Sequence, residues 1–333
     1  MQKISNNTFR TILNTEKYDF DIDYKSKMMF IGSCFTENIG GILKKAKFNI
    51  DINPFGIIYN PLSVKNALDN IIKKRIFSEN DLFYFNERWN SFMHHSVFSD
   101  INIAETLKSI NDRISRANEN IESNDFLFIS FGTAWVYKYI ETGIVVSNCH
   151  KIPGKEFKKD IIEPKDIIKS YVLLYKDLRK INPKSKIVFT ISPVRHLKDG
   201  FAENSLSKSI LRYAISEIVD ACKDSYYFPA YEIQTDDLRD YRFYNSDMVH
   251  PNETAIDYIF NFFSKSFFSD ETKQIFNKIE KINRSLEHRP FNTKAEEFIR
   301  FVRNTQNEIE TLYAKYNFLN FKEELSYLKE IIK

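Results

Sequence analysis

The amino-acid sequence predicts a three-layer α/β/α domain built on a parallel sheet, followed by a helical tail. Short strand-like runs alternate with stretches of helical periodicity along most of the chain. One of these runs, Phe126–Phe131 (FLFISF), is apolar on both faces, as a buried parallel strand should be. Glycine is scarce, with 8 in 333 residues, and Gly32, Gly56 and Gly132 each lie at or soon after a strand-like run.

Five strands are expected, because five apolar or β-branched runs end at turn residues. They cover residues 28–31, 48–52, 126–131 and 186–191, with a weaker strand at 226–228. Amphipathic periodicity predicts helices at 36–45, 61–74, 101–121, 164–181, 204–221 and 252–268. Strands that alternate with helices of this length indicate a parallel sheet covered on both faces.

Two segments lie outside this alternation. Residues 135–140 and 144–147, joined around Gly143, predict a β-hairpin inserted after the third strand. Residues 270–333 are charged and helical, with Ile275, Ile279 and Ile282 at helical spacing, which indicates an apolar face that needs a cover. We therefore expect an α/β domain over 20–269 and a helical extension over 270–333, which either packs on that domain or pairs with another chain.

Composition and charge argue against several classes of protein. Hydrophobic residues make up 43% and charged residues 28%, which is typical of a globular chain and not of a disordered one. Lys and Arg number 48 against 45 Asp and Glu, so the net charge of +3 predicts no nucleic-acid partner. No apolar run is long enough to span a membrane.

The cysteines and the first residues predict the compartment. The three cysteines cannot all pair and lack the CxxC spacing of a zinc site, so we expect no metal and no cofactor. The first residues lack the apolar core of a signal peptide. Both observations favour a reduced, cytoplasmic protein.

In an open parallel sheet, ligands bind at the carboxyl ends of the strands, so the residues that follow each strand are candidates for a site. These are Ser33, Cys34, Gly56, Asn60, Gly132, Thr133, Arg195 and His196. A later polar loop carries Asp247 and His250. A nucleophile at a strand-to-helix turn and a late Asp-x-x-His together predict a hydrolase triad, in which the histidine takes the nucleophile's proton and the aspartate orients it.

Two sequence blocks resemble those of a known hydrolase superfamily. Ile31-Gly32-Ser33-Cys34-Phe35-Thr36 and Asp247-x-x-His250 resemble the first and last blocks of the SGNH/GDSL hydrolases. The chain is more similar still to their distant branch, the GSCFA-domain proteins. The similar strings, over about residues 28–265, are GSCFTENIG, NPFGIIYNP, ISFGTAWVY, SNCHKIPGKEF, ISPVRHLKDGFAEN and YFPAYEIQTDDLRDYRFYNSDMVHPN.

The resemblance implies a fold and a class of reaction. The expected fold is a flavodoxin-like, five-stranded parallel sheet of the SGNH-hydrolase type. The expected activity is that of an acyl-ester or thioester hydrolase, or an acyltransferase, acting on a small-molecule or carbohydrate acyl ester through a covalent acyl-enzyme. The GSCFA branch is named for its motif and not for a reaction, so this activity comes from the wider superfamily.

The resemblance leaves two candidates for the nucleophile. An ungapped alignment with the GDSL block puts Cys34 at the position of the nucleophilic serine and Ser33 at that of the aspartate. The nucleophile is therefore Cys34, or Ser33 after a one-residue shift of the turn. If it is Cys34, the imidazole of His250 and the positive end of the first helix predict a thiol pKa below the usual value.

The oxyanion hole departs from the superfamily pattern. Gly56 matches the glycine of the second block, whose N–H would point into the site, and the Cys34 N–H would contribute as well. The third block, normally Gly-x-Asn, is Gly132-Thr133-Ala134 here, so its asparagine is missing. Either Asn60 or Asn148 replaces it, or the hole uses backbone groups alone. The departure leaves open a non-catalytic binding module on the same fold.

Further polar residues are expected at the mouth of the site. His150 follows the predicted hairpin, so residues 148–151 would form a lid or a substrate clamp. Arg195 and His196 follow the fourth strand, and an arginine there suits a carboxylate or phosphate on the substrate.

Overall fold

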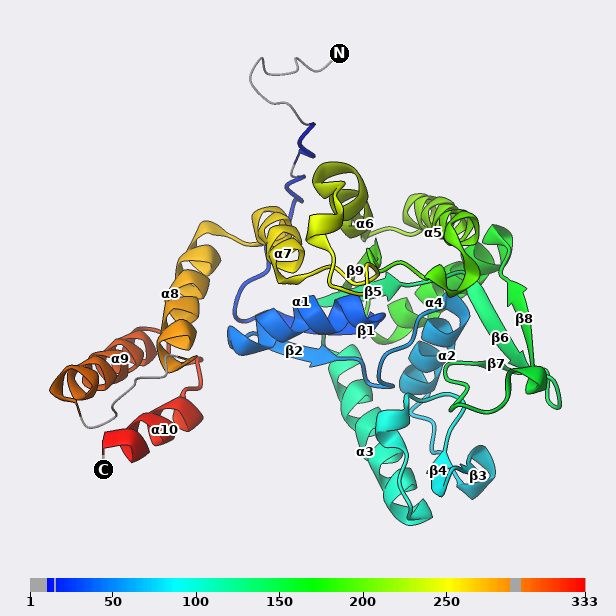
Figure 1. The fold of residues 1–333 in the computed structure, drawn as a ribbon, viewed down its shortest axis with the longest axis horizontal. Coiled ribbons are helices and arrows are strands. Elements are labelled where there is room, and N and C mark those ends of the chain that lie inside the picture. The colour runs from blue at the N-terminus through cyan, green and yellow to red at the C-terminus, as the bar shows by residue number, and fades with distance from the viewer. Residues whose placement is uncertain (1–10, 15, 288–294, 333) are drawn as a thin grey trace. The chain divides into compact units, whose positions relative to one another are not determined.

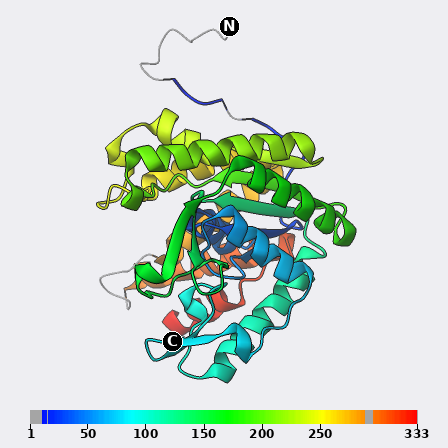
Figure 2. The ribbon, with the colours of Figure 1, turned by 90° about the vertical axis from the view of Figure 1, so that its right-hand side faces the viewer.

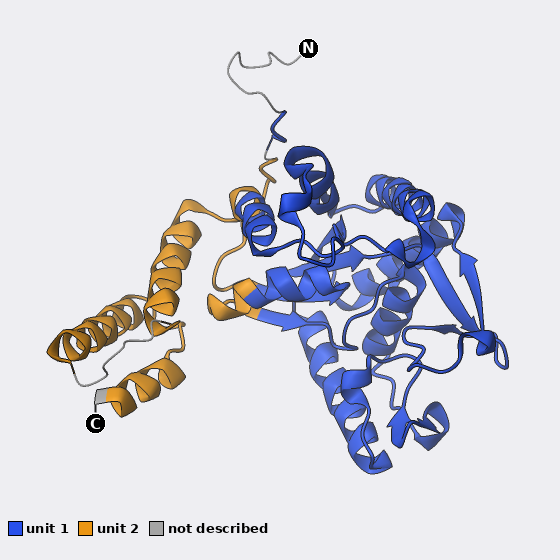
Figure 3. Cartoon of the chain, viewed as in Figure 1, with its two compact units in different colours: residues 1–15, 27–41, 50–263 blue, residues 16–26, 42–49, 264–333 orange. Residues whose placement is uncertain are grey.

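The chain groups into two compact units. The computed structural model describes residues 11–14, 16–287 and 295–332. Within these, unit 1 takes residues from 1–15, 27–41 and 50–263, and unit 2 takes residues from 16–26, 42–49 and 264–333 (Figure 3). The predicted ranges 20–269 and 270–333 differ from these units, because two short N-terminal segments group with the C-terminal helices. That residues 20–269 and 270–333 fold as separate domains stays a prediction.

Unit 1 is built on a five-stranded sheet with the order β10-β9-β5-β1-β2 (Figure 1). The strands are β1 (Lys27–Gly32), β2 (Asn49–Ile52), β5 (Phe126–Phe131), β9 (Lys186–Ile191) and β10 (Ser225–Phe228). Parallel pairing joins β1 to β5, β5 to β9 and β9 to β10. The predicted α/β class and its flavodoxin-like strand order are confirmed.

Amphipathic helices pack on the sheet. They are α1 (Cys34–Lys45), α2 (Pro61–Ile72), α3 (Ile103–Ile121), α4 (Pro164–Ile181), α5 (Phe201–Ala221) and α7 (Glu253–Phe267). The apolar faces of α2, α3, α4 and α5 share one core cluster with Met29, Ile129 and Phe189 of the strands. On the other face of the sheet, Phe128 contacts Phe263 of α7, with 5.4 Å between ring centroids. Because side chains alternate along a strand, helices cover both faces, as predicted.

Short helical turns connect these elements. They are Glu79–Asp81, Ser96–Phe98, Gly154–Glu156, Leu197–Asp199, α6 (Ala230–Glu232) with its continuation Ile233–Leu238, and Tyr241–Phe243.

The predicted hairpin is part of a separate three-stranded antiparallel sheet (Figures 1 and 2). Strand β6 (Trp135–Tyr139) pairs with β7 (Val145–Val146), as expected, and also with β8 (Phe157–Ile161), which the sequence did not predict. The β8 sequence FKKDI is mostly charged, so it lacks an apolar strand signal. A further unpredicted pair, β3 (Phe83–Phe85) with β4 (Arg88–Asn90), has strands of three residues each.

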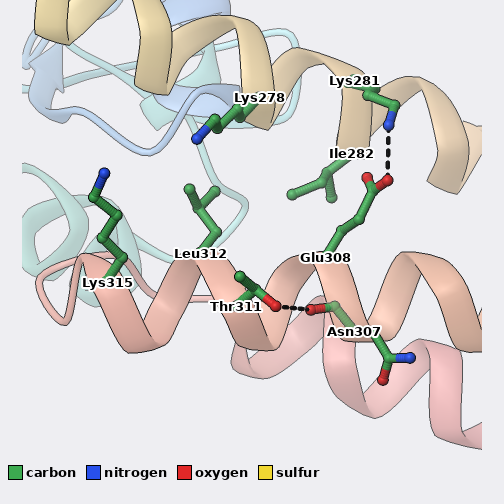
Figure 4. A pocket seen from close by; sticks show the side chains of 8 residues that line it. All are labelled: Lys278, Lys281, Ile282, Asn307, Glu308, Thr311, Leu312 and Lys315. Carbon is green, nitrogen blue, oxygen red and sulfur yellow. Dashed lines mark hydrogen bonds and ion pairs between the residues drawn. The ribbon is translucent and has the colours of Figure 1, made fainter.

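Unit 2 contains the helices α8 (Asp270–Glu287), α9 (Glu296–Lys315) and α10 (Lys322–Ile332). The spaced isoleucines of α8 are buried, as their periodicity predicts. A pocket of about 430 Å³ lies between α8 and α9, where Ile282 and Leu312 come from opposite helices and Lys281 Nζ lies 2.7 Å from Glu308 Oε1 (Figure 4). Within the described ranges, no helix combines the length and the apolar character needed to cross a membrane.

A tight turn at Gly32 leads from β1 into α1. Gly32 has φ +137°, and a Cβ there would lie 2.0 Å from the Ser130 carbonyl oxygen, so only glycine fits. The buried side chain of Asn53, which follows β2, accepts hydrogen bonds at Oδ1 from the Gly32 N–H (2.9 Å) and the Thr36 hydroxyl (3.1 Å). The start of α1 is therefore tied to both strands that flank β1.

We predict that Gly32→Ala destabilises unit 1 by about 4 kcal/mol or more, because backbone atoms of β5 occupy the space of the new methyl group. Urea unfolding followed by the fluorescence of Trp89 and Trp135 measures this. Gly41→Ala is the matched control: its Cβ would meet no atom within 4 Å, so it should gain up to about 1 kcal/mol of helix propensity. An unchanged unfolding midpoint for Gly32→Ala would show that β1 and β5 do not approach this closely.

Candidate functional site

An open cleft of about 780 Å³ lies at the carboxyl edge of the main sheet. Of the residues predicted for the site, the cleft is lined by Cys34, Asn60, Thr133, Asn148, Arg195, His196 and His250. The remaining predicted residues are not among those that line the cleft: Ser33, Gly56, Gly132, His150 and Asp247. The small sheet contributes Trp135, Tyr137 and Phe157 to the wall.

Ser33 and Cys34 are neighbours in the chain, but their side chains lie in different environments. Ser33 is fully buried, and its Oγ lies 2.9 Å from Oγ of Ser130. Its carbonyl oxygen accepts the N–H of Thr36 at 2.9 Å. Cys34 begins α1, is partly exposed and lines the cleft. A substrate in the cleft therefore meets the thiol and not the hydroxyl.

Burial has the largest effect on the Cys34 thiol and raises its pKa above the usual value. The backbone N–H groups of Cys34 and Phe35 and the ammonium of Lys208 act in the opposite direction, while the Glu37 carboxylate adds to the rise. The expected pKa below the usual value is therefore wrong. Desolvation of the thiolate outweighs the helix N-terminus and the nearby cation.

Asp247 and His250 form a hydrogen-bonded pair. Asp247 Oδ1 accepts the N–H groups of Val249 (2.9 Å) and His250 (3.0 Å), and its Oδ2 lies 2.7 Å from His250 Nδ1. These bonds, led by the two backbone donors, lower the pKa of Asp247 to about 2. A carboxylate at Nδ1 leaves Nε2 of the neutral imidazole as the proton acceptor. In the described ranges, no hydrogen bond joins this imidazole to the Cys34 sulfur.

The backbone N–H groups of three glycine-turn residues near the cleft are used inside the protein. The Gly56 N–H donates to the Asn53 carbonyl oxygen at 2.8 Å. The N–H groups of Gly132 and Thr133 both donate to the Tyr59 carbonyl oxygen, at 2.7 and 3.2 Å. The predicted role of Gly56 as a donor to the substrate is therefore wrong, because its N–H closes a turn after β2.

The two candidates for the missing asparagine differ in their hydrogen bonding. Asn60 caps α2, with Oδ1 accepting the Ser63 N–H (2.8 Å) and Nδ2 donating to the Ser63 hydroxyl (3.0 Å). Asn148 uses its Oδ1 to accept the His150 N–H at 2.8 Å. Its Nδ2 has no hydrogen-bond partner in the described part of the chain. Asn148 is therefore better placed than Asn60 to donate to a ligand.

His150 lies behind the cleft wall and does not face a ligand. It is buried, with Nε2 at 2.8 Å from the Ser91 carbonyl oxygen. The Ser91 hydroxyl lies 2.9 Å from Nδ1 of the buried His94, whose ring stacks on Phe55. Burial lowers the pKa of both histidines, that of His94 to about 3. His150 therefore does not contact a ligand itself, and its ring anchors the segment 148–151. The other three residues of this segment line the cleft, so its role as a lid or clamp stays a prediction.

Arg195 packs against the loop that carries His250. Its backbone N–H donates to the Val249 carbonyl oxygen at 3.2 Å. Its guanidinium lies over the rings of Tyr244 and Tyr241, at 4.1 and 5.0 Å from their centroids. These contacts hold residues 241–250 in place. The expected contact of Arg195 with a substrate anion stays a prediction.

His196 forms part of the cleft wall as a neutral imidazole. Its ring meets the edge of Tyr59 at 5.6 Å between centroids. Burial, followed by the positive charge of Lys208, lowers the pKa of His196 to about 3. A Cβ at Gly132 would lie 3.0 Å from His196 Nε2, so the glycine permits this close approach.

A buried lysine beneath the cleft was not predicted. Lys208 of α5 is 2% exposed, and its Nζ donates to the carbonyl oxygens of Gly132 and Ser192, both at 2.7 Å. These carbonyls follow β5 and β9, so the ammonium joins the ends of two adjacent strands. Burial lowers the pKa of Lys208 to about 7. The sequence contains one indication of this burial: Lys208 lies at helical spacing from Leu211 and Ile215, on the face of α5 that is buried.

The cleft contains a second thiol, Cys149. Burial raises its pKa, and the charge of Lys198 opposes the rise. Cys34, Cys149 and the buried Cys222 are all free. Across residues 11–14, 16–287 and 295–332, no three His, Cys, Asp or Glu side chains gather to hold a metal ion.

The fold and the cleft together define an open parallel α/β domain with an accessible cysteine at a strand-to-helix turn and an Asp–His pair in a later loop. The chain belongs to the GSCFA family: the model of that family matches residues 27–263. A second model, described as the GSCFA domain protein, C-terminal domain, matches residues 279–333. Among curated proteins, no sequence matches the chain significantly.

Several solved structures show a remote likeness. A family 3 carbohydrate esterase of Clostridium thermocellum is 14% identical, with a TM-score of 0.33 over 76% of this chain and 97% of that one. A family 3 carbohydrate esterase of Talaromyces cellulolyticus is 12% identical, with a TM-score of 0.36 over 76% and 98%. A family 2 enzyme of Corynascus thermopiles (Myceliophthora fergusii) is 11% identical, with a TM-score of 0.37 over 74% and 67%. Likenesses this remote assign no activity.

We predict that unit 1 loses stability as the pH falls from about 6.5 toward 3, because its buried histidines take up protons only on unfolding. The pKa of His94 is about 3, below its ordinary value of 6.5, so its contribution is complete above pH 6.5 and is lost below. When the pH is lowered from 7 to 5, the unfolding free energy of the wild type should fall by about 2 kcal/mol more than that of His94→Phe, which lacks the titrating imidazole. Urea unfolding at both pH values measures it, and equal losses in the two proteins would contradict it.

Proposed function

We propose that this protein is an acyl-ester or thioester hydrolase, or an acyltransferase, that forms a covalent acyl-enzyme on Cys34. The observation that carries the proposal is one cleft lined by an accessible thiol at a helix N-terminus and by His250, whose Nδ1 is held by Asp247 and whose Nε2 has no hydrogen-bond partner among the described residues. Tyr59, Trp135 and Tyr137 give the cleft aromatic faces, which favours a small-molecule or carbohydrate ester as substrate.

In the proposed reaction, His250 Nε2 takes the thiol proton as Cys34 Sγ attacks the acyl carbon. The tetrahedral oxyanion collapses, the bond to the leaving oxygen or sulfur breaks, and the leaving group takes the proton from the imidazolium. Water or an acceptor hydroxyl then attacks the thioester while Nε2 accepts its proton. The carbon–sulfur bond breaks, and Cys34 recovers a proton from the imidazolium. Asp247 stays ionised and stabilises the imidazolium throughout.

The N–H groups of Cys34 and Phe35 are the proposed oxyanion donors. Both lie in the first turn of α1, where N–H groups have no partner within the helix, and both lower the pKa of the Cys34 thiol. The Nδ2 of Asn148, which has no hydrogen-bond partner within the described ranges, is a third candidate donor. Hydrolysis and transfer use the same groups and differ only in the molecule that attacks the thioester.

The second candidate function is a binding module that uses the same cleft without chemistry. The observations that favour it are the missing hydrogen bond between Sγ and His250 across the described residues and the raised thiol pKa. In the enzyme proposal, that hydrogen bond forms once substrate occupies the cleft. A cytoplasmic location and association through the C-terminal helices stay predictions.

We predict that p-nitrophenyl acetate acetylates Cys34 and is turned over. Intact-mass and peptide mass spectrometry locate the acetyl group, and release of p-nitrophenol gives the rate. Cys34→Ala should abolish both, and His250→Ala should lower the acylation rate by a factor of about 100 or more, because the thiol loses its proton acceptor.

Ser33→Ala and Cys149→Ala are the matched controls. Both should keep the acetylation of Cys34, although Ser33→Ala loses the hydrogen bond to Ser130 and about 1 kcal/mol of stability. An acetyl group on Ser33, together with activity in Cys34→Ala, would reverse the assignment of the nucleophile. No acetylation at either residue would favour the binding module.

A further inference from the structure

A histidine that the proposed reaction does not use lines the cleft. His95 precedes the short helical turn Ser96–Phe98. It lines the same cavity as Cys34 and His250. The preceding residue, His94, is 1% exposed and lies in the interior. Of these two adjacent imidazoles, that of His95 is the one that a ligand in the cleft can reach.

A backbone hydrogen bond fixes the tautomer of the neutral His95 ring. The Val97 N–H donates to His95 Nδ1 at 3.3 Å, in the manner of a helix N-cap. Because a backbone N–H can only donate, Nδ1 carries no proton in this arrangement, and the proton of the neutral imidazole lies on Nε2. Among the described residues, His95 Nε2 has no hydrogen-bond partner. His95 therefore presents an unused N–H donor.

Contacts with the loop after β2, residues 53–58, fix the position of His95. Its backbone N–H donates to the Phe55 carbonyl oxygen at 2.9 Å. Gly56 has φ +73°, and a Cβ there would lie 2.3 Å from the Cβ of His95, so only glycine permits this close approach. Gly56, whose own N–H closes a turn, thus makes room for a side chain that has a free donor.

The same loop is bonded to the turn that carries Cys34. The Ile58 N–H donates to the Gly32 carbonyl oxygen at 2.9 Å. The Gly32 N–H donates to Asn53 Oδ1, also at 2.9 Å. The loop on which His95 packs is therefore held at both ends against the residue two positions before Cys34. A chain of direct contacts connects His95 to the start of α1, where the thiol lies.

We propose that the Nε2–H of His95 donates a hydrogen bond to the acyl oxygen of the substrate, which gains negative charge as Cys34 Sγ attacks the acyl carbon. This inference rests on the proposed function. His95 transfers no proton, because its Nδ1 stays bonded to Val97 and the oxyanion re-forms the carbonyl bond when the leaving group departs. His250 has the opposite tautomer: Asp247 holds its Nδ1, so its Nε2 accepts a proton.

Backbone donors from other strand ends are not available to this oxygen. The N–H groups of Gly56, Gly132 and Thr133 donate to carbonyl oxygens of the protein. His95 therefore adds a side-chain donor to the N–H groups at the start of α1. Because its backbone, its Cβ and its Nδ1 are all held by contacts, the ring does not have to reorient when charge develops on the substrate.

The experiment compares two reactions of Cys34 in His95→Asn. Asparagine keeps the N-cap, because its Oδ1 can accept the Val97 N–H, but its shorter side chain does not reach the position of Nε2. Acetylation by p-nitrophenyl acetate should become about 100-fold slower. Alkylation by iodoacetamide, which displaces iodide at a saturated carbon and forms no oxyanion, should keep its rate. Mass spectrometry of the Cys34 peptide measures both.

Equal losses in the two reactions would show that His95 acts only through the fold of the cleft, and would overturn the inference. Unchanged acetylation in folded His95→Asn would overturn it as well. His95→Gln is the matched rescue variant, because its amide nitrogen can occupy the position of Nε2. It should recover most of the acetylation rate, and a rate as low as that of His95→Asn would contradict the inference.

A binding measurement without turnover separates this inference from the proposed function. In Cys34→Ala, which forms no acyl-enzyme, acetate is the probe, because its carboxylate resembles the oxyanion. At pH 8, NMR of ¹⁵N-labelled histidine should show a proton on His95 Nε2 and none on Nδ1, and acetate should shift the Nε2 signal. A proton on Nδ1 instead, or an unshifted signal, would overturn the inference. A shift by acetate in a protein whose Cys34 is never acetylated would overturn the proposed function alone.

Discussion

The close contact between the backbones of β1 and β5 at Gly32 is the constraint on which the candidate site depends. Because the Ser130 carbonyl oxygen occupies the space of a side chain, the chain leaves the sheet there with φ +137°. The next side chain, Ser33, then points into the interior toward Ser130, and Cys34 starts α1 at the cleft. The hydrogen bonds of Asn53 to Gly32 and Thr36 keep the turn in this form.

The electrostatics of the cleft follow from which groups the fold buries. Asp247 is exposed and ionised, held by two backbone N–H groups and by His250. His196 is half-buried and neutral, whereas Lys208 is buried and, among the described residues, its hydrogen-bond partners are carbonyl oxygens. Burial of the Cys34 thiol disfavours its ionised form and raises its pKa, and the charge of Lys208 only partly opposes this rise. In the proposed reaction, the thiol therefore loses its proton only when substrate and His250 come together in the cleft.

Residues that follow the strands first satisfy hydrogen bonds inside the protein. The N–H of Gly56 closes a turn, and the N–H groups of Gly132 and Thr133 donate to the Tyr59 carbonyl oxygen of a neighbouring loop, because buried backbone donors need partners even where a ligand also binds. His150 anchors its segment through Ser91, and Arg195 packs on tyrosines of the loop that carries His250. A position at a strand end therefore brings a residue to the cleft without deciding whether it faces a ligand.

The sequence by itself determined the alternation of strands and helices, their parallel arrangement and the family. These properties depend on local periodicity and on contiguous motifs, which is why β9 and α4 have the predicted bounds of 186–191 and 164–181. Only the tertiary structure decided that β8 joins the small sheet, that Ser33 is buried, and that Lys208 binds a carbonyl 76 residues away. Hydrogen-bond partners and desolvation depend on residues that are distant in the chain, and no local pattern records them. The raised pKa of Cys34 has the same origin, because the groups that bury its thiol and the lysine that opposes the rise come together only in the folded protein.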